Sequence, residues 1–298
     1  MQNAKQTAGS SVSVVGLGAM GSAIARAFVA RGHNVTVWNR SAARMAPFSA
    51  DGIACAKGVA DCIAASAVTV ICIDDYDACN TLLHTKAVES AVRGKTLVQF
   101  STGKPQEARD AEQWANSHAA AYLDGAILAY PREVGQDGLI FLSGKSKAYE
   151  SSRGILDALT SDLRYLGEPI GAAAGLDVAI LFYYICTHLG LTQAALICES
   201  EGVSAELLAS VIADSSPSDV QEVRHLGAAI ANNDFSKPGA SLGVYSGILD
   251  RVLSQAEDAN IDDQIPQFAN RILKRGVQAG LANEEIVSLI KLLRTGST

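Results

Sequence analysis

Short runs of β-branched and aliphatic residues alternate with stretches of helical spacing through the first half of the chain. The strand-like runs are residues 12–15, 34–38, 68–73, 96–100, 122–124 and 140–143. The stretches with helical spacing are residues 20–31, 42–51, 59–65, 78–91 and 105–118. Strands that alternate with helices form βαβ units, so the pattern predicts an α/β domain with a parallel sheet.

After residue 171 the strand-like runs end, and helical spacing continues almost to the C-terminus. The expected helices are residues 171–201, 205–213, 220–232, 242–259, 266–279 and 283–293. Gly202, the Ser215-Ser216-Pro217 run and the Lys237-Pro238-Gly239 run mark breaks between helices. We therefore expect an α/β domain at residues 11–170 and an all-helical domain at residues 171–298.

The charge balance excludes one class of partner. The chain of 298 residues has 24 Lys and Arg against 31 Asp and Glu, a net charge of −7. This composition provides no basic surface that follows a phosphate backbone, so we expect no nucleic-acid partner. The hydrophobic fraction is 48% and the charged fraction is 18%, which indicates a large core and excludes intrinsic disorder.

The chain is also unusually apolar, with a mean hydropathy of +0.16. Either a membrane helix or a large oligomer interface would explain this value. Residues 1–10 contain no apolar run, so they are interpreted as a polar tail and not as a signal peptide. The six cysteines show neither a C-x-x-C motif nor paired metal-ligand spacing, which indicates buried thiols in a reducing cytoplasm and no metal site.

A glycine-rich turn follows the first predicted strand. Its residues are Gly16, Leu17, Gly18, Ala19, Met20 and Gly21, a G-x-G-x-x-G motif that leads into an amphipathic helix. In this context Gly16 permits the tight turn, Gly18 lets the backbone approach a pyrophosphate, and Gly21 lets the helix pack on the strand. The N-terminus of the helix favours the negative diphosphate. The motif therefore predicts a Rossmann-type dinucleotide-binding domain.

The end of the second predicted strand distinguishes the two nicotinamide cofactors. An NAD site has Asp or Glu at this point, to accept a hydrogen bond from the ribose 2′-hydroxyl. Here the chain has Asn39, Arg40 and Ser41, with Arg44 one turn later, and no carboxylate. Arg binds a phosphate through paired hydrogen bonds, so we predict NADPH as the cofactor. Alternatively, Arg40 only solvates the end of a loop.

These features and several further motifs resemble the β-hydroxyacid dehydrogenase superfamily over essentially the full chain. Within it, the chain is most similar to the NADPH-dependent imine reductases and reductive aminases. The stretches that carry this resemblance are residues 37–41, 75–78, 101–105 with 108–109, 122–129, 165–167, 176–181 and 239–243. The resemblance implies a homodimer with interlocked helical domains. Ile73 and Asp74 follow the third parallel strand, so we expect them to border the ribose of the cofactor.

Asp177 distinguishes this chain within the superfamily. The hydroxyacid dehydrogenases have a Gly-x-Gly-x-x-x-Lys motif here, and their Lys assists proton transfer at the substrate oxygen. In this chain the register of that Lys is occupied by Asp177, as is common in imine reductases. An iminium acceptor of hydride is a cation, which a nearby carboxylate favours and a Lys would repel. A protonated Asp177 would instead act as a general acid, and the sequence leaves both roles open.

Several other residues are expected near the substrate. Leu181, Tyr184 and His188 follow Asp177 at helical spacing and form one stripe. We interpret Tyr184 as a further catalytic residue and Leu181 and His188 as pocket residues. A His on an apolar helix is more often a core residue than a catalyst, and Tyr184 is equally compatible with plain packing. Ser101 and Thr102 follow the end of the fourth strand, where parallel sheets bind ligands, and the resemblance to the dehydrogenases implies that this pair contacts substrate and nicotinamide; alternatively, Ser101 caps the next helix. The resemblance adds two more pocket residues, Tyr130 and Tyr245.

Three motifs depart from the family. Tyr183 and Tyr184 stand where many relatives have a Met-Tyr or Met-Trp pair, and Val244-Tyr245 lies near a position that is often Gln in reductive aminases. Arg132 and Glu133 replace small or apolar residues. A charged pair at this position indicates either a polar substrate or an exposed loop.

Residues 178–198 form a run of 21 residues without a formal charge, long enough to cross a bilayer. The run contains polar residues and follows a domain that needs no membrane, which argues against a membrane span. In the family that the chain resembles, this helix links the two domains, so the resemblance implies a long interdomain helix that is covered in a dimer. The sequence thus predicts a cytoplasmic NADPH-dependent imine reductase, without a membrane partner, that reduces a small-molecule cyclic imine or iminium in a cleft at the dimer interface. The alternatives are a hydroxyacid dehydrogenase-like carbonyl reductase and a non-catalytic NADPH-binding protein.

Overall fold

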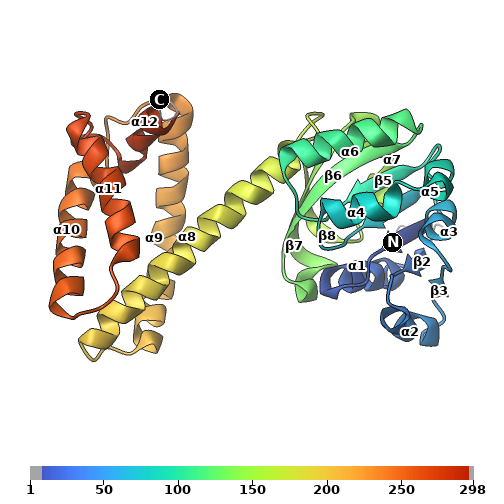
Figure 1. Ribbon diagram of the computed structural model, residues 1–298, viewed down its shortest axis with the longest axis horizontal. Helices are drawn as coiled ribbons and strands as arrows, with labels where there is room; N and C mark the ends of the chain where they lie inside the picture. Colours follow the sequence, from blue (N-terminus) through green and yellow to red (C-terminus); the bar gives the residue numbers. More distant parts are fainter. Residues whose placement is uncertain (1–8, 295–298) are drawn as a thin grey trace, which may run out of the picture. The chain divides into compact units, whose positions relative to one another are not determined.

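The computed structural model describes residues 9–294, without the side chains of residues 216–219. Most of the predicted polar tail, residues 1–8, therefore lies outside the described residues. The chain forms two compact units, Met1–Phe182 and Tyr183–Thr298. Each unit is described by itself (Figure 1).

The first unit is built on an eight-stranded sheet. Its strands are β1 (Ser11–Val15), β2 (Asn34–Trp38), β3 (Ala54–Cys55), β4 (Val68–Ile71), β5 (Thr96–Gln99), β6 (Ala121–Leu128), β7 (Gln136–Gly144) and β8 (Thr160–Tyr165). The order in the sheet is β3-β2-β1-β4-β5-β6-β7-β8. The order reverses between β1 and β4, and at such a switch point the loops after the two strands diverge and leave a crevice.

The prediction of a parallel sheet is confirmed for most strand pairs, but it is wrong for β6 and β7, which pair antiparallel. A parallel pair needs a crossover of about a dozen residues or more. Only residues 129–135 connect these two strands, and they include the short 3₁₀ helix η1 (Pro131–Glu133). The chain therefore returns as a hairpin.

Seven helices cover the two faces of this sheet. They are α1 (Ala19–Ala30), α2 (Ala42–Ala50), α3 (Val59–Ala64), α4 (Tyr76–Leu83), α5 (Lys86–Ala91), α6 (Pro105–Ser117) and α7 (Ser146–Leu156). Val12 and Val14 of β1 pack with α1, α2 and α7 on one face, whereas Val15 packs with α3 to α6 on the other. This alternation buries both faces of β1, as expected for a central parallel strand.

The predicted helix at residues 78–91 is two helices in the structure. α4 ends at Leu83, and Thr85 starts α5 by accepting a hydrogen bond from the backbone N–H of Val88 at 3.4 Å. A Thr side chain that caps a helix start competes with helix continuation. The strands β3 and β8 and the helix α7 were not predicted.

The second unit is helical. Its elements are the C-terminal part of α8 (Ala172–Ser200), then α9 (Ala205–Asn232), α10 (Leu242–Asp258), α11 (Gln264–Gln278), η2 (Ile286–Leu289) and α12 (Ile290–Leu293). Leu242, Leu273 and Leu281 form the centre of its core. Gln193 of α8 is buried and donates a hydrogen bond to the backbone oxygen of Asp262 at 2.9 Å.

The predicted helix break at residues 215–217 is wrong, because the backbone of α9 continues through it from Ala205 to Asn232. A proline removes one backbone hydrogen bond from a helix interior, at a cost of about 3 kcal/mol. A helix of 28 residues retains most of its other hydrogen bonds, so it tolerates this loss. The predicted helix at 283–293 is mostly the 3₁₀ turn η2 followed by the single turn of α12.

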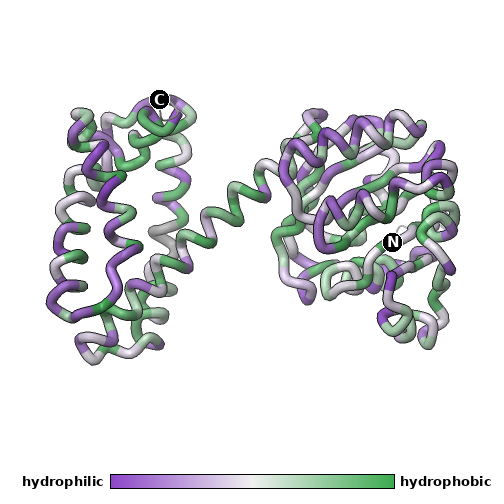
Figure 2. The backbone as a smooth tube through the Cα atoms, in the orientation of Figure 1, coloured by the Kyte–Doolittle hydropathy of each residue, from purple (hydrophilic) through white to green (hydrophobic). Residues whose placement is uncertain are grey.

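Helix α8 is apolar along most of its length, as the hydropathy colouring in Figure 2 shows. By length and composition it would suffice to cross a membrane, and only 17% of its most apolar window is buried within one chain. Phe182 is 66% exposed and Ile185 is 55% exposed. Exposed apolar surface on this scale is typical of an interface that a single chain leaves uncovered.

Candidate cofactor and substrate site

A pocket of about 750 Å³ lies in the first unit, at the carboxyl ends of the parallel strands. This volume is in the usual range for sites of small ligands and cofactors. The pocket lies at the switch point of the sheet, where such folds bind their ligands. Its walls come from five strand ends, with these lining residues: Gly16, Gly18–Gly21, Trp38–Ser41, Arg44, Cys72–Asp74, Ala78, Thr81, Leu82, Phe100, Thr102, Ala126, Ile127, Asp177 and Leu181.

The glycine turn forms one wall of this pocket, and its three glycines are in different surroundings. Gly16 has a φ of +100°, and a Cβ there would lie 2.1 Å from the backbone oxygen of Cys72. A Cβ on Gly21 would lie 2.1 Å from the oxygen of Gly16, so its absence lets α1 pack closely on the turn. A Cβ on Gly18 would meet nothing nearer than Arg44, at 3.7 Å, and would project into the pocket.

The N-terminus of α1 faces this pocket without a side-chain cap and without an acidic residue in its first turn. Backbone N–H groups at a helix start attract an anion when no side chain accepts from them. Leu17 is the one residue of the motif outside the pocket lining. Its N–H donates to Oδ1 of Asn39 at 2.9 Å, and its side chain is buried.

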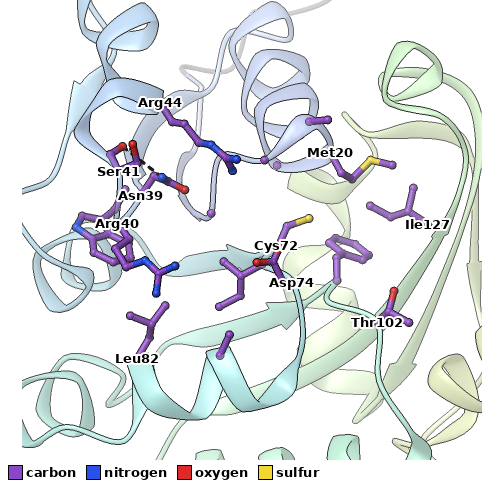
Figure 3. Close-up of a pocket in the computed structure, with 18 of the residues that line it drawn as sticks. Met20, Asn39, Arg40, Ser41, Arg44, Cys72, Asp74, Leu82, Thr102 and Ile127 are labelled. Carbon is purple, nitrogen blue, oxygen red and sulfur yellow. Dashed lines mark hydrogen bonds between the residues drawn. The ribbon is translucent and has the colours of Figure 1, made fainter.

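Two arginines bring positive charge to the same pocket. Figure 3 shows the guanidinium groups of Arg40 and Arg44 pointing into it, on the side opposite Met20, Thr102 and Ile127. Among the side chains that the structure describes, neither arginine has an ion-pair partner. Asn39 donates from Nδ2 to the oxygen of Ser41 at 3.2 Å, which shapes the turn between them. This end of the pocket therefore suits an anion.

Helix α4 forms a further wall of the pocket, which was not predicted from the sequence. Ala78, Thr81 and Leu82 line the pocket, as do Ile73 and Asp74, which were predicted. The three α4 residues follow the i, i+3, i+4 spacing of one helix face. Asp75 begins this helix by accepting from the N–H of Ala78 at 2.8 Å. The cap residue Asp75 and this spacing are the signals in the sequence that would have found this wall.

The other end of the pocket is mostly apolar and contains one carboxyl group. Phe100, Ala126, Ile127 and Leu181 line it together with Thr102 and Asp177. Asp177 is 8% exposed, and burial raises the pKa of its carboxyl above the usual value. In such surroundings an ionised carboxyl group can stabilise a cation, and a protonated one can serve as an acid.

Two buried side chains from the sheet anchor the first turn of α8, one turn before Asp177. Ser143 of β7 accepts from the N–H of Ala173 at 3.1 Å and donates to the oxygen of Ile170 at 2.7 Å. Asp124 of β6 accepts from the N–H of Ala174 at 3.0 Å. These contacts supply acceptors to backbone N–H groups that a helix start leaves unpaired. They thereby fix the position of Asp177.

Ser101 and Thr102, predicted as a pair, have different surroundings. Thr102 lines the pocket, whereas Ser101 is only 4% exposed and is not among the lining residues. The hydroxyl of Ser101 accepts from the N–H of Ile73 at 3.0 Å and lies 3.4 Å from Sγ of Cys79. Ser101 thus connects β5 with the loop after β4. It does not cap α6, which starts at Pro105 after Lys104.

The remaining predicted pocket residues lie outside this pocket. Tyr184 and His188 belong to the part of α8 in the second unit, where their rings stack with centroids 6.4 Å apart. Tyr245 is half-buried against the helical core around Leu242. Tyr130 is 65% exposed, and the guanidinium of Arg132 lies 4.8 Å from its ring centroid.

Glu133 is used locally: its Oε2 accepts from the N–H of Tyr130 at 2.8 Å, and Oε1 lies 3.5 Å from Nη2 of Arg132. The pair Arg132–Glu133 is thus an exposed loop feature in the first unit. Among the residues 9–294, no group of three His, Cys, Asp or Glu side chains is placed to hold a metal ion.

The sheet order, the glycine turn and the pocket at the switch point together define a dinucleotide-binding protein of the Rossmann class. Two family models match the chain: the NAD-binding domain of 6-phosphogluconate dehydrogenase over residues 11–167, and the C-terminal domain of NADPH-dependent reductive aminase-like proteins over residues 169–295. The chain belongs to the imine reductase and reductive aminase family of oxidoreductases.

Relatives along the full chain support this assignment. The NADPH-dependent reductive aminase of Aspergillus oryzae is 25% identical, over 96% of this chain and 97% of its own length. The imine reductase of Myxococcus stipitatus, solved with NADP+, is 32% identical with a TM-score of 0.89, over 95% of this chain and 99% of that one. The reductive aminase of Aspergillus terreus, solved with NADPH and ethyl levulinate, is 28% identical with a TM-score of 0.87, over 96% and 99%.

The predicted family, the class of fold and the oxidoreductase class are therefore confirmed. NADP+ or NADPH in both solved relatives agrees with the cofactor that was predicted from Arg40 and Arg44. The individual site residues remain predictions.

Proposed function

We propose that this protein is an NADPH-dependent imine reductase that transfers hydride to the C=N bond of a small cyclic imine or iminium. One observation carries the proposal: Asp177, a largely buried carboxyl group, lines the apolar end of the same pocket that the glycine turn and two arginines line at the other end, and these arginines have no ion-pair partner among the described side chains. We assign NADPH binding to residues 11–170, and substrate binding and dimerisation to residues 171–298.

The residues of the pocket fit a bound NADPH. A Cβ on Gly18 would project into the space where a diphosphate approaches the uncapped start of α1. Arg40 and Arg44 provide the cations that a 2′-phosphate needs, and the turn after β2 has no carboxylate to repel it. When bound, NADPH supplies the hydride.

The side chains of the pocket position the substrate, and Asp177 either balances its charge or supplies a proton. As a carboxylate, Asp177 stabilises the positive charge of an iminium in surroundings of low dielectric constant. As an acid, it donates its proton to the substrate nitrogen. Thr102 offers a hydroxyl group to the carboxamide or to the amine, and Phe100 and Ile127 exclude water from this end of the pocket. Positioning provides most of the rate acceleration in such a reaction.

The decisive experiment measures NADPH and NADH oxidation with 1-pyrroline, with ketone–amine mixtures and with ketones, and the reverse reaction with hydroxyacids. We expect turnover of 1-pyrroline with NADPH. Asp177→Asn should lower kcat by about 10²- to 10⁴-fold, the usual contribution of a general acid or base, with NADPH affinity nearly unchanged. Asp157→Asn, at an exposed position after α7, is the matched control. Unchanged turnover in Asp177→Asn would remove Asp177 from the mechanism.

The same assay separates the alternatives. Oxidation of hydroxyacids without imine reduction would show a dehydrogenase, although the register of that class's Lys is occupied by Asp177. Tight NADPH binding without turnover of any substrate would show a non-catalytic binding protein.

We further propose that the enzyme is a homodimer with interlocked helical domains and a cleft at their interface, which Tyr184, His188, Tyr130 and Tyr245 help to form. The exposed apolar face of α8, including Phe182 and Ile185, supports this proposal. Without detergent, the protein should have a mass near twice 31.1 kDa. Phe182→Asp should shift it toward the monomer. A stable soluble monomer, or a chain that needs detergent, would contradict the dimer.

The six cysteines are all free thiols, which supports the proposed location in the cytoplasm.

A further inference from the structure

Asp124 is a second carboxyl group near Asp177, and the mechanism above does not use its charge. It lies on β6 and is 1% exposed. Its Oδ1 accepts from the hydroxyl of Tyr76 at 2.5 Å, and its Oδ2 accepts from the N–H of Ala174 in the first turn of α8. The hydroxyl of Tyr122 lies a further 3.3 Å from that of Tyr76. A buried carboxyl group thus joins two tyrosines to the helix that carries Asp177.

The groups that face Asp124 come from three elements, and none of them is a cation. They are Tyr76 of α4, Tyr122 of β6 and Asp177 of α8, with the thiol of Cys79 beyond Tyr122. No Lys, Arg or His pairs with Asp124 among the described side chains. A carboxylate in these surroundings loses the stabilisation of water without gaining an opposite charge.

Burial therefore raises the pKa of the Asp124 carboxyl from 3.8 to about 7, although the hydrogen bonds from Tyr76 and Ala174 act in the opposite direction. The negative charge of Asp177 raises it further. A like charge nearby disfavours ionisation of a carboxyl group, so an ionised Asp177 favours the protonated form of Asp124.

The hydrogen-bond network accommodates both protonation states of Asp124. When Asp124 is ionised, Tyr122 donates to Tyr76 and Tyr76 donates to Asp124. When Asp124 is protonated, its O–H can donate to Tyr76, whose hydroxyl rotates to donate to Tyr122. In both states Oδ2 accepts from Ala174, so the first turn of α8 keeps its anchor. Asp177 lines the open pocket, whereas Asp124 does not, so the charge is less costly on Asp177.

We propose that Asp124 is a positioning residue for the reaction: it anchors the helix that carries Asp177, and of the two carboxyl groups it is the one that holds a proton more readily, so that the first negative charge of the pair lies on Asp177. The role in the reaction rests on the proposed imine reduction. The titration of Asp124 is a property of the folded chain and does not depend on turnover.

The test is an infrared pH titration of the full-length protein, which follows the carbonyl band of a protonated carboxylic acid. Wild type should show a buried acid with a midpoint near 7. Asp124→Asn should remove this band. Tyr76→Phe removes a hydrogen bond that favours the charged form, so the midpoint should rise. Asp177→Asn removes the neighbouring negative charge, so the midpoint should fall.

Two controls separate charge from structure. Tyr165→Phe removes another tyrosine hydroxyl from the same unit, one that donates to the oxygen of Gly144 at 2.6 Å, and it should leave the midpoint unmoved. Ser143→Ala removes the other anchor of α8 without changing any charge. It should lower turnover while the infrared midpoint stays near its wild-type value.

Kinetics on 1-pyrroline supply the second readout. The wild-type pH profile of kcat/KM should have an inflection near 7 that is absent from Asp124→Asn. An infrared titration without a buried acid near neutrality, or midpoints that do not move in opposite directions in Tyr76→Phe and Asp177→Asn, would overturn the inference. If the infrared results hold but no imine is reduced, the proposed function fails and the Asp124 titration stands. Should Asp124→Asn fail to fold, the other two variants still decide the matter.

Discussion

Removing Arg40 and Arg44 tests how the pocket selects its cofactor. Both guanidinium groups point into the pocket, and neither is paired with an acid in the described part of the chain (Figure 3). A 2′-phosphate would therefore be their counter-ion, and NADH lacks this group. We expect Arg40→Ala and Arg44→Ala to weaken NADPH binding and to leave NADH binding almost unchanged.

The magnitude follows from the exposure of the two side chains. A hydrogen bond to a charged group contributes about 1.5–3 kcal/mol. Both arginines are exposed, so solvent screening places each near the lower end of that range. About 1.4 kcal/mol corresponds to a tenfold change in Kd, so each variant should weaken NADPH about tenfold and the double variant up to about a hundredfold.

The assay is a fluorescence titration with NADPH and, in parallel, with NADH. The ratio of the two Kd values is the quantity of interest, because damage to the pocket that weakens both cofactors equally leaves this ratio unchanged. Arg153→Ala on α7 is the matched control, since it removes an exposed arginine that does not line the pocket. Added salt should reduce the preference for NADPH in wild type more than in the double variant. Equal losses for NADPH and NADH, or a wild type that prefers NADH, would refute the reasoning.

Two further predictions concern the glycine turn and two cysteine thiols of the first unit. Gly21→Ala places a Cβ against the oxygen of Gly16 and should lower the free energy of unfolding by about 1–3 kcal/mol, measured by thermal unfolding. Gly18→Ala should keep the wild-type free energy of unfolding and bind NADPH more weakly. Similar behaviour of the two variants would count against separate roles for the two glycines. Burial raises the pKa of the Cys62 and Cys72 thiols to about 12, so at pH 8 about 10⁻⁴ of each is thiolate. Alkylation of the native protein at pH 8, followed by peptide mapping, should therefore modify both thiols slowly, and rapid modification of the buried Cys62 would contradict this reasoning.

Much of the fold was predictable because its signals are local. The first two strands and the glycine turn were found by runs of apolar residues and by glycine spacing within about 30 residues. The strand β8 (Thr160–Tyr165) was missed because its sequence, TSDLRY, has no apolar run. Such a strand is stabilised by pairing with β7 at the edge of the sheet, and this pairing has no local signal.

The candidate site likewise has one part that local sequence signals predict and another part that they do not. The residues around the glycine turn and β2 were found because each motif is contiguous. The anchoring of α8 joins Asp124 to Ala174, which is 50 residues later, and Ser143 to Ala173, which is 30 residues later. Only the folded chain shows such contacts. Ser101 was predicted to contact the substrate because it follows a strand end. In the structure its buried hydroxyl accepts a hydrogen bond from the N–H of Ile73.

The hydrogen bond between Asn39 and Leu17 has an implication for how this pocket can evolve. The side-chain oxygen of Asn39 holds the glycine turn through the N–H of Leu17. Aspartate has the same shape and retains such an oxygen. An Asn39→Asp exchange would keep this support for the turn and place a carboxylate where NAD-dependent relatives of the fold bind their ribose. A single amide-to-acid exchange can therefore change the cofactor that such a pocket prefers while the glycine turn keeps its support, although the hydrogen bond from Nδ2 to the oxygen of Ser41 is lost.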